Sequence, residues 1–285
     1  MKKRDTLRAK RVKPRGILHL PAAHPLTGYA RYWPADGLAP FVEHLWTVEW
    51  DLPSPSTSEV LSHPSVQLVI EKGASRVGGV HTGLFTRHLE GKGRVLGVKF
   101  RPGGFRPLFG RAVSELTDRM IPVAEIFGRA AEGLEERALA HDGHERAFGE
   151  IQEFLARVTP PPDPTVDLLA SVAERIAADR EITRVEQLVP ITGIPLRRLQ
   201  RLFDDWVGVP PKWVIQRYRL HEAAERIALG GALDWPDLAL ELGYADQAHF
   251  IRDFRKLVGR SPGDYAKSLF PGRLSASSRS PRRRR

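Results

Sequence analysis

Hydrophobic residues recur at helical spacing along residues 238–262, near the C-terminal end of the chain. Two apolar stripes at spacings of three and four are formed by Leu238, Leu242, Phe250, Phe254 and Leu257. Gly243 lies between the stripes, where a helix end can adopt positive φ without a steric penalty, and Asp246 is placed to accept hydrogen bonds from the first N–H groups of the second helix. The pattern therefore predicts two short helices joined by a tight turn, with an outer face that carries Gln247, His249, Arg252 and Lys256.

An earlier copy of this pattern makes the prediction stronger. Leu188 and Gly193 precede Leu238 and Gly243 by 50 residues. The second copy's turn is one residue longer, so the offset then becomes 51, and it pairs Leu199 with Phe250, Arg201 with Arg252, Phe203 with Phe254, Gly208 with Gly259 and Pro211 with Pro262. Such a duplication predicts two helix-turn-helix units, joined by a long helix over residues 211–230.

One residue sets the first copy apart. Pro190 falls in its first helix, and proline costs roughly 3 kcal/mol in a helix interior. We therefore expect that helix to be short or kinked around Val189.

The N-terminal half has a different pattern. Runs rich in Val, Leu, Phe and Trp, separated by Gly, Pro or Ser, occupy residues 44–50, 65–71, 83–89 and 94–100. This spacing predicts short strands of a small antiparallel barrel or sandwich. Helical patterning returns over 114–158. The sequence TPPPDPT at 159–165 follows, and its four prolines predict a stiff spacer between two domains.

The fold class expected from these patterns is α+β and multidomain. The expected units are a basic disordered arm (1–16), a β-rich sensor or dimerisation domain with helices (17–158), a Pro-rich linker (159–165), an all-α domain with two helix-turn-helix units (166–270) and an Arg-rich disordered tail (271–285).

Net charge adds little to the case for a nucleic-acid partner. The chain carries +10, but residues 1–16 carry +7 and residues 273–285 carry +6, whereas residues 165–272 hold 15 basic and 15 acidic side chains. The excess therefore lies in the two tails, where it is typical of solvated segments that attract phosphate without sequence preference.

No apolar run approaches a membrane span, and the absence of cysteine leaves no disulfide, thiolate metal site or thiol nucleophile.

The C-terminal segment resembles the DNA-binding domain of the AraC/XylS transcription regulators. The resemblance covers residues 166–269 and is carried by GIPLRRLQRLF…VGVPP and by GYADQAHFIRDFRKLVGRSPGDY. It implies that two recognition helices enter adjacent major-groove segments. The base-facing positions that it implies are Arg197, Gln200 and Arg201 in the first copy, and Gln247, Ala248, His249 and Arg252 in the second.

The chemistry of these side chains suits that role. Arg can donate two parallel hydrogen bonds to guanine, Gln can pair with adenine, and Ala offers a methyl contact to thymine. Arg201 and Arg252 occur at the same phase of both copies, which favours DNA contact over a merely solvated position. For His249, a partly packed ring and a contact with DNA remain equally open.

The N-terminal half resembles, more weakly, a cupin-like domain that related regulators use to bind an effector or to dimerise. His63, His81 and His88 form no metal-ligand pattern with a nearby carboxylate, so we expect no metal and no cofactor. Arg101 and Arg106, beside Gly103 and Gly104, suit an anionic ligand, although an ion pair or a plain loop is the more common use of such residues.

The function expected is a cytoplasmic, sequence-specific DNA-binding regulator, monomeric or homodimeric. Its partners would be double-stranded DNA, an unidentified small-molecule effector and RNA polymerase, with no membrane. Two alternatives remain: an effector-independent architectural DNA-binding protein, and a DNA-targeted enzyme. Residues 17–164 contain no nucleophile elbow, HExxH or phosphate-binding glycine loop, so we expect no enzymatic activity.

Overall fold

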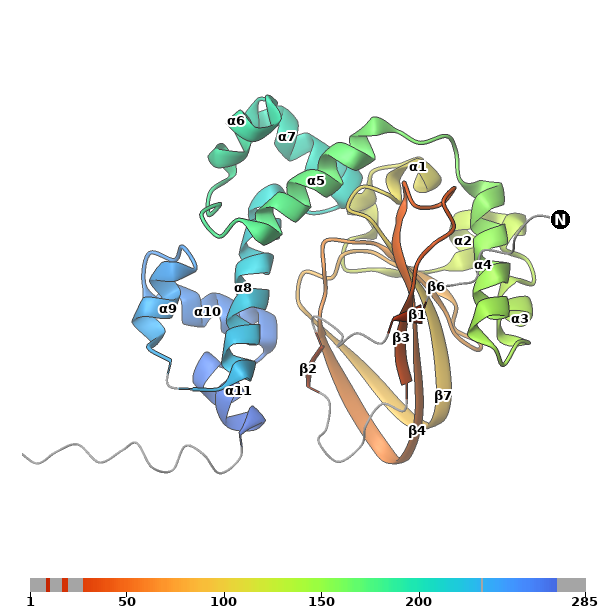
Figure 1. Ribbon diagram of the computed structural model, residues 1–285, viewed down its shortest axis with the longest axis horizontal. Helices are drawn as coiled ribbons and strands as arrows, with labels where there is room; N and C mark the ends of the chain where they lie inside the picture. The colour runs from red at the N-terminus through yellow and green to blue at the C-terminus, as the bar shows by residue number, and fades with distance from the viewer. Residues whose placement is uncertain (1–8, 11–16, 20–27, 232, 271–285) are drawn as a thin grey trace, which may run out of the picture.

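The computed structural model describes residues 9–10, 17–19, 28–231 and 233–270, and side chains within the last two ranges. The N-terminal half forms one antiparallel sheet, and the C-terminal half is helical. Figure 1 shows the long helix α8 beside the sheet, with α6 and α7 near one end of α8 and α9 and α10 near the other. The expected α+β division is therefore confirmed.

The sheet has the strand order β1-β3-β4-β7-β5-β6-β8, and β2 pairs with β4. Its strands are β1 (Ala9–Lys10), β2 (Ile17–His19), β3 (Gly28–Tyr32), β4 (Val42–Leu61), β5 (Gln67–Ile70), β6 (Arg76–Gly78), β7 (Leu84–Phe100) and β8 (Met120–Pro122). Among the described strands, β1 and β8 end this order without pairing to each other, so the sheet does not close into a barrel.

The expectation of short strands was wrong for the two longest elements. From Leu84 onward, the expected strands 83–89 and 94–100 belong to one strand, β7, which pairs with β4 along nearly its whole length. β4 in turn runs through Pro53 and Pro55. Proline is tolerated there because the ladder shifts register between Leu52 and Ser56, so no N–H is needed.

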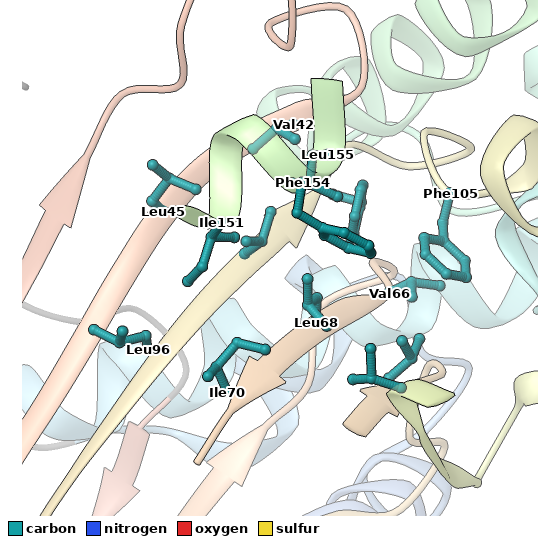
Figure 2. Close-up of a cluster of buried hydrophobic side chains, with 14 of the residues drawn as sticks. Val42, Leu45, Val66, Leu68, Ile70, Leu96, Phe105, Ile151, Phe154 and Leu155 are labelled. Carbon is teal, nitrogen blue, oxygen red and sulfur yellow. The ribbon is translucent and has the colours of Figure 1, made fainter. Parts of the chain in front are cut away.

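Helices cover one face of the sheet. They are α1 (Arg106–Phe109), the 3₁₀ turn η1 (Val113–Leu116), α2 (Val123–Phe127), the 3₁₀ turn η2 (Gly128–Ala131), α3 (Leu134–Leu139) and α4 (His144–Val158). Figure 2 shows Ile151, Phe154 and Leu155 of α4 against the strands, where the core also contains Leu45, Leu68 and Leu96. The opposite face of the sheet is left to line a cavity.

The C-terminal half contains α5 (Pro164–Ala178), the 3₁₀ turn η3 (Val185–Gln187), α6 (Leu188–Thr192), α7 (Leu196–Leu202), the π-helical turn η4 (Phe203–Val207), α8 (Pro211–Leu229), α9 (Trp235–Glu241), α10 (Gln247–Val258) and α11 (Pro262–Leu269). α5 begins inside the range assigned to the linker. Asp163 caps it through Thr165 N at 2.8 Å, and Pro164 occupies its first position, where a missing N–H is harmless.

Disorder of the tails stays a prediction. Residues 271–285 and most of 1–16 lie outside the described residues, whereas Ala9–Lys10 pair with β3. None of the helices in the described part of the chain is long and apolar enough to span a membrane.

Candidate nucleic-acid interface and ligand cavity

The duplication seen in the sequence is present in the backbone. Gly193 and Gly243 end the first helices with φ of 67° and 79°, and Gly208 and Gly259 end the second helices with φ of 91° and 78°. These left-handed conformations favour glycine. The paired core positions are all fully buried: Leu199 with Phe250, and Phe203 with Phe254. The two predicted helix-turn-helix units are therefore confirmed as structural copies.

The first copy is less regular than the second, as Pro190 led us to expect. Its first helix is split into the 3₁₀ turn η3 and the five-residue α6, whereas α9 is one continuous helix. Its second helix, α7, ends in the π-helical turn η4, whereas α10 runs without a break. Asp246 caps α10 through His249 N at 2.7 Å, as predicted, while Pro195 at the start of α7 gives no side-chain cap.

The structure brings the first copy's three predicted base-facing residues to one open surface. Arg197, Gln200 and Arg201 project from α7, and all three are exposed. None of them makes a hydrogen bond or ion pair with another residue of the described chain. Their donors are therefore available to an external acceptor, and base contact remains a prediction.

The second copy presents its predicted residues unequally. Ala248 and Arg252 are exposed on α10, and Arg252 has no partner among the described residues. Gln247 is half-buried. His249 is both packed and reachable: its ring stands edge-on to Tyr244, its Nε2 lies 3.4 Å from Asp253 Oδ2, and its side chain is 44% exposed.

Asp253 links this helix to α8. Besides facing His249, it accepts a hydrogen bond from Gln216 Nε2 at 3.4 Å. Asp253 therefore orients the His249 ring, and Gln216 of α8 holds Asp253 in place. A hydrogen bond from His249 to DNA would be made by a ring whose orientation is already fixed.

Of the two uses considered for Arg101 and Arg106, an anionic ligand or an ion pair, the structure shows ion pairs. Arg101 Nη1 lies 2.7 Å from Asp167 on α5, and Arg106 Nε lies 3.1 Å from Asp205 in η4, with its guanidinium over Trp206. Both arginines thus join the two domains, and the alternative of ion pairing holds.

A cavity of about 180 Å³ lies on the uncovered face of the sheet, and an adjoining one of about 180 Å³ shares part of its wall. Alternate residues of β4 line the first cavity, because successive side chains of a strand point to opposite faces. They are His44, Trp46, Val48 and Trp50. Three of these four residues are large and apolar, and their recurrence at every second position was the signal in the sequence that an apolar surface forms on this face.

Two tryptophans form the floor of the first cavity by lying on glycines. Trp46 pairs across the ladder with Gly97, and Trp50 pairs with Gly93. A Cβ on Gly97 would lie 2.0 Å from the Trp46 ring, and one on Gly93 would lie 2.2 Å from the Trp50 ring. The Trp46 indole donates to Gln67 Oε1 at 2.9 Å, so the ring is fixed at its edge as well.

Charged groups meet at one end of the first cavity. Glu43 lies 3.0 Å from Lys99 Nζ and 3.3 Å from His44 Nδ1. Burial favours the neutral carboxyl, but Lys99 and His44 outweigh it and lower the pKa of Glu43 to about 2. Burial also lowers the pKa of His44. The cavity thus combines a flat apolar floor with a polar end.

The three histidines considered as metal ligands have separate surroundings. His63 stacks on His221 at 4.5 Å, His81 packs against Phe85, and His88 hydrogen-bonds Thr57 at 3.0 Å. In the ranges that the structure describes, no cluster of three His, Asp or Glu side chains has the arrangement of a metal site.

Comparison with known families matches two parts of the chain. Residues 188–268 match a model described as a helix-turn-helix domain, and residues 30–122 match a domain of unknown function, DUF6597. The C-terminal domain is an AraC-type helix-turn-helix domain. The matched ranges cover α6 to α11 in the first case and most of the sheet in the second.

Curated relatives match the chain over short lengths. The chain is 36% identical over 81 residues to the putative HTH-type transcriptional regulator YkgA of Escherichia coli K12, covering 28% of this chain and 34% of that protein. It is 31% identical over 118 residues to the transcriptional activator NphR of a Rhodococcus species, covering 36% of this chain and 35% of that protein. The chain therefore spans about a third of the length of these relatives.

A likeness to solved structures extends over more of the chain but is distant. ToxT of Vibrio cholerae, solved with an unsaturated fatty acid bound, covers 80% of this chain and 96% of its own, with a TM-score of 0.38 and 12% identity.

Proposed function

We propose that this protein is a transcription regulator that reads DNA through two adjacent major-groove segments and responds to a small molecule held in its N-terminal domain. We place it in the cytoplasm, without catalytic activity, and propose that it contacts RNA polymerase when it activates transcription. The observation that carries the proposal is the pair Arg201 and Arg252, which occupy the same position of two copies and are exposed without a partner among the described residues.

The geometry supports base reading by both recognition helices. α8 joins the units, so that α7 and α10 would contact DNA about one helical turn apart, roughly 34 Å. Arg197, Gln200 and Arg201 would read one segment, and Gln247, Ala248, His249 and Arg252 the other. Phosphate contacts from flanking Lys and Arg would set the register without reading sequence.

The cavity supports a sensing role for the N-terminal domain. An architectural DNA-binding protein has no use for an internal space, and we would expect side chains to fill it. Here Trp46 and Trp50 lie flat on glycines and leave the space open, while Gln67, Lys99 and His44 offer polar contacts. These features favour a ligand over the architectural alternative.

The test is selection of bound sites from a random DNA pool by the full chain, followed by two matched variants on α10. Arg252→Ala should weaken binding to the selected site by about 1–3 kcal/mol and relax base preference at one position. Arg255→Ala, an exposed arginine three residues further along the same helix, should leave base preference unchanged. Equal loss by Arg252→Ala on selected and random DNA would contradict its base-reading role.

Binding of a small molecule to the N-terminal domain is tested by a separate measurement. Small-molecule libraries can be screened for an increase in the thermal midpoint of the full chain, since a ligand that binds only the folded state stabilises it. A hit should lose its effect when Gly97→Ala pushes the Trp46 ring into the cavity. A hit that stabilises Gly97→Ala equally would bind elsewhere.

A further inference from the structure

The two helix-turn-helix units have separate hydrophobic cores, and α8 enters both. Val214 and Ile215 in the first half of α8 pack with the core of the first unit. Leu220 and Ile227 in its second half pack with the core of the second unit. The relative position of α7 and α10 therefore depends on how each unit packs against α8.

One short segment of the N-terminal domain runs between these two cores. We call residues 80–84 the strap. Val80 is fully buried in the core of the first unit. Leu84 packs against the core of the second unit, and its Cδ2 lies 3.5 Å from where a Cβ on Gly259 would stand. A single segment thus touches both units on one side of α8.

Arg217 ties the middle of the strap to the middle of α8. Its Nη2 donates to His81 O at 2.7 Å and to Gly83 O at 3.2 Å, and the guanidinium lies 4.7 Å from the Trp213 ring. The side chain is 1% exposed. No carboxylate of the described chain lies within ion-pair distance, and its Nε and Nη1 have no hydrogen-bond partner.

Burial of a charged guanidinium without a carboxylate is unfavourable, so Arg217 depends on its hydrogen bonds to the carbonyls of His81 and Gly83. Burial lowers the pKa of Arg217 to about 9, because desolvation opposes the charge. The carbonyls of the strap supply the acceptors that water would otherwise give. If the strap separated from α8, this cation would lose both acceptors. The contact therefore favours one position of α8 relative to the strap.

Asp118 of the N-terminal domain fixes the strap through three hydrogen bonds. Asp118 N donates to Val80 O at 3.0 Å, and the Asp118 carboxylate accepts from Thr82 N and Thr82 Oγ1, each at 2.7 Å. Ion pairs extend the contact at both ends: Arg106 with Asp205 at the first unit, and Arg260 with Glu59 at the second.

We propose that the strap is a brace that fixes the separation of the two recognition helices and thereby determines which spacing of DNA half-sites the protein accepts. Arg217 is its positioning residue. The inference rests on the proposed DNA-binding function for its consequence, but the brace itself can be measured without DNA. One added base pair moves a half-site by about 3.4 Å along the DNA axis and rotates it by roughly 34°. A braced pair of helices cannot follow that change.

The direct test is the distance between the units. The chain has no cysteine, so spin labels can be placed selectively through Arg198→Cys on α7 and Lys256→Cys on α10, both of which are exposed. Double electron–electron resonance on the full chain should give one narrow distance distribution. Arg217→Met should broaden it, and Arg146→Met, an exposed arginine on α4, should not. An unchanged width in Arg217→Met would overturn the brace.

Thr82→Val provides a second test in case Arg217→Met does not fold. It removes only the Oγ1 bond to Asp118 and keeps the shape of the side chain, so it should broaden the same distribution to a smaller extent. Circular dichroism melts identify a variant that has lost its fold. If Arg217→Met unfolds while Thr82→Val folds with a wild-type distribution, the brace is wrong.

The DNA consequence is measured on selected sites whose half-sites are moved apart or together by one base pair. We expect the full chain to lose at least about tenfold in affinity on the altered sites, and Arg217→Met to lose less than about threefold. Equal discrimination by both proteins would contradict the brace. Absence of any sequence-specific binding, together with a narrow distance distribution that Arg217→Met broadens, would instead contradict the proposed function and leave the brace standing.

Discussion

The two turn glycines of the duplicated units offer an internal comparison of backbone strain and steric clash. Gly193 and Gly243 occupy matching positions with φ of 67° and 79°. A Cβ on Gly193 would meet no atom within 4 Å, whereas a Cβ on Gly243 would lie 2.3 Å from Thr183 Cγ2. Gly193→Ala therefore introduces strain alone, and Gly243→Ala introduces strain and overpacking.

The expected magnitudes follow from these two terms. An alanine in the left-handed region costs roughly 1–2 kcal/mol. Reduced freedom of the unfolded chain offsets about 0.4–1 kcal/mol of that cost. Both contributions are common to the two variants and cancel in their difference. Gly243→Ala should therefore be less stable than Gly193→Ala by the overpacking term, about 1–3 kcal/mol.

Urea denaturation, followed by tryptophan fluorescence, measures this difference from the two midpoints at a common slope. Thr183→Gly, added to Gly243→Ala, removes both of the nearest clashing atoms and should recover most of the difference. Equal stability of the two alanine variants, or no recovery by Thr183→Gly, would refute the reasoning. Either result would mean that the turn of the second unit does not press on Thr183 in solution.

Three further predictions concern the cap of α10, the charge beside the cavity and the C-terminal tail. Asp246→Ala should cost about 1 kcal/mol of stability in thermal or urea denaturation, since His249 N loses its acceptor, and Asp246→Asn should keep most of it. The folded pKa of Glu43 is about 2, below its ordinary value of 4.5, so its contribution to stability is present above about pH 4.5 and is lost as the pH falls through 2. Glu43→Gln should flatten the dependence of the denaturation midpoint on pH over that window, and a wild-type pH profile in this variant would argue against the pairing with Lys99 and His44. Deleting residues 279–285, which carry five arginines, should lower the slope of log affinity against log salt while the selected sequence stays the same, and a change of selected sequence would show that the tail reads bases.

Local patterns predicted the C-terminal domain well because its determinants are local. Helical stripes, turn glycines and the Asp246 cap are all set by residues a few positions apart, and the duplication provided a second measurement of each. Pro190 even predicted which copy would be irregular. The π-helical turn η4 had no such signal, since nothing in Phe203–Val207 departs from ordinary helix chemistry.

The N-terminal domain was predicted less well because its determinants are distant in sequence. Pro53 and Gly91 look like strand ends, but each sits at an irregular point of a long ladder whose partner strand lies some 40 residues away. Arg101 and Arg106 find their carboxylates 66 and 99 residues further on. The importance of Arg217 was invisible for the same reason, because its acceptors belong to another domain.

The tryptophan floor of the cavity has a consequence for how this domain can change over time. The depth of the space is set by residues 93 and 97, which sit beneath the indole rings. Any side chain larger than hydrogen at either position would tilt a ring into the cavity and make it shallower. Ligand preference could therefore shift among homologues through substitutions at two glycines that no ligand need touch, with every contacting residue left unchanged.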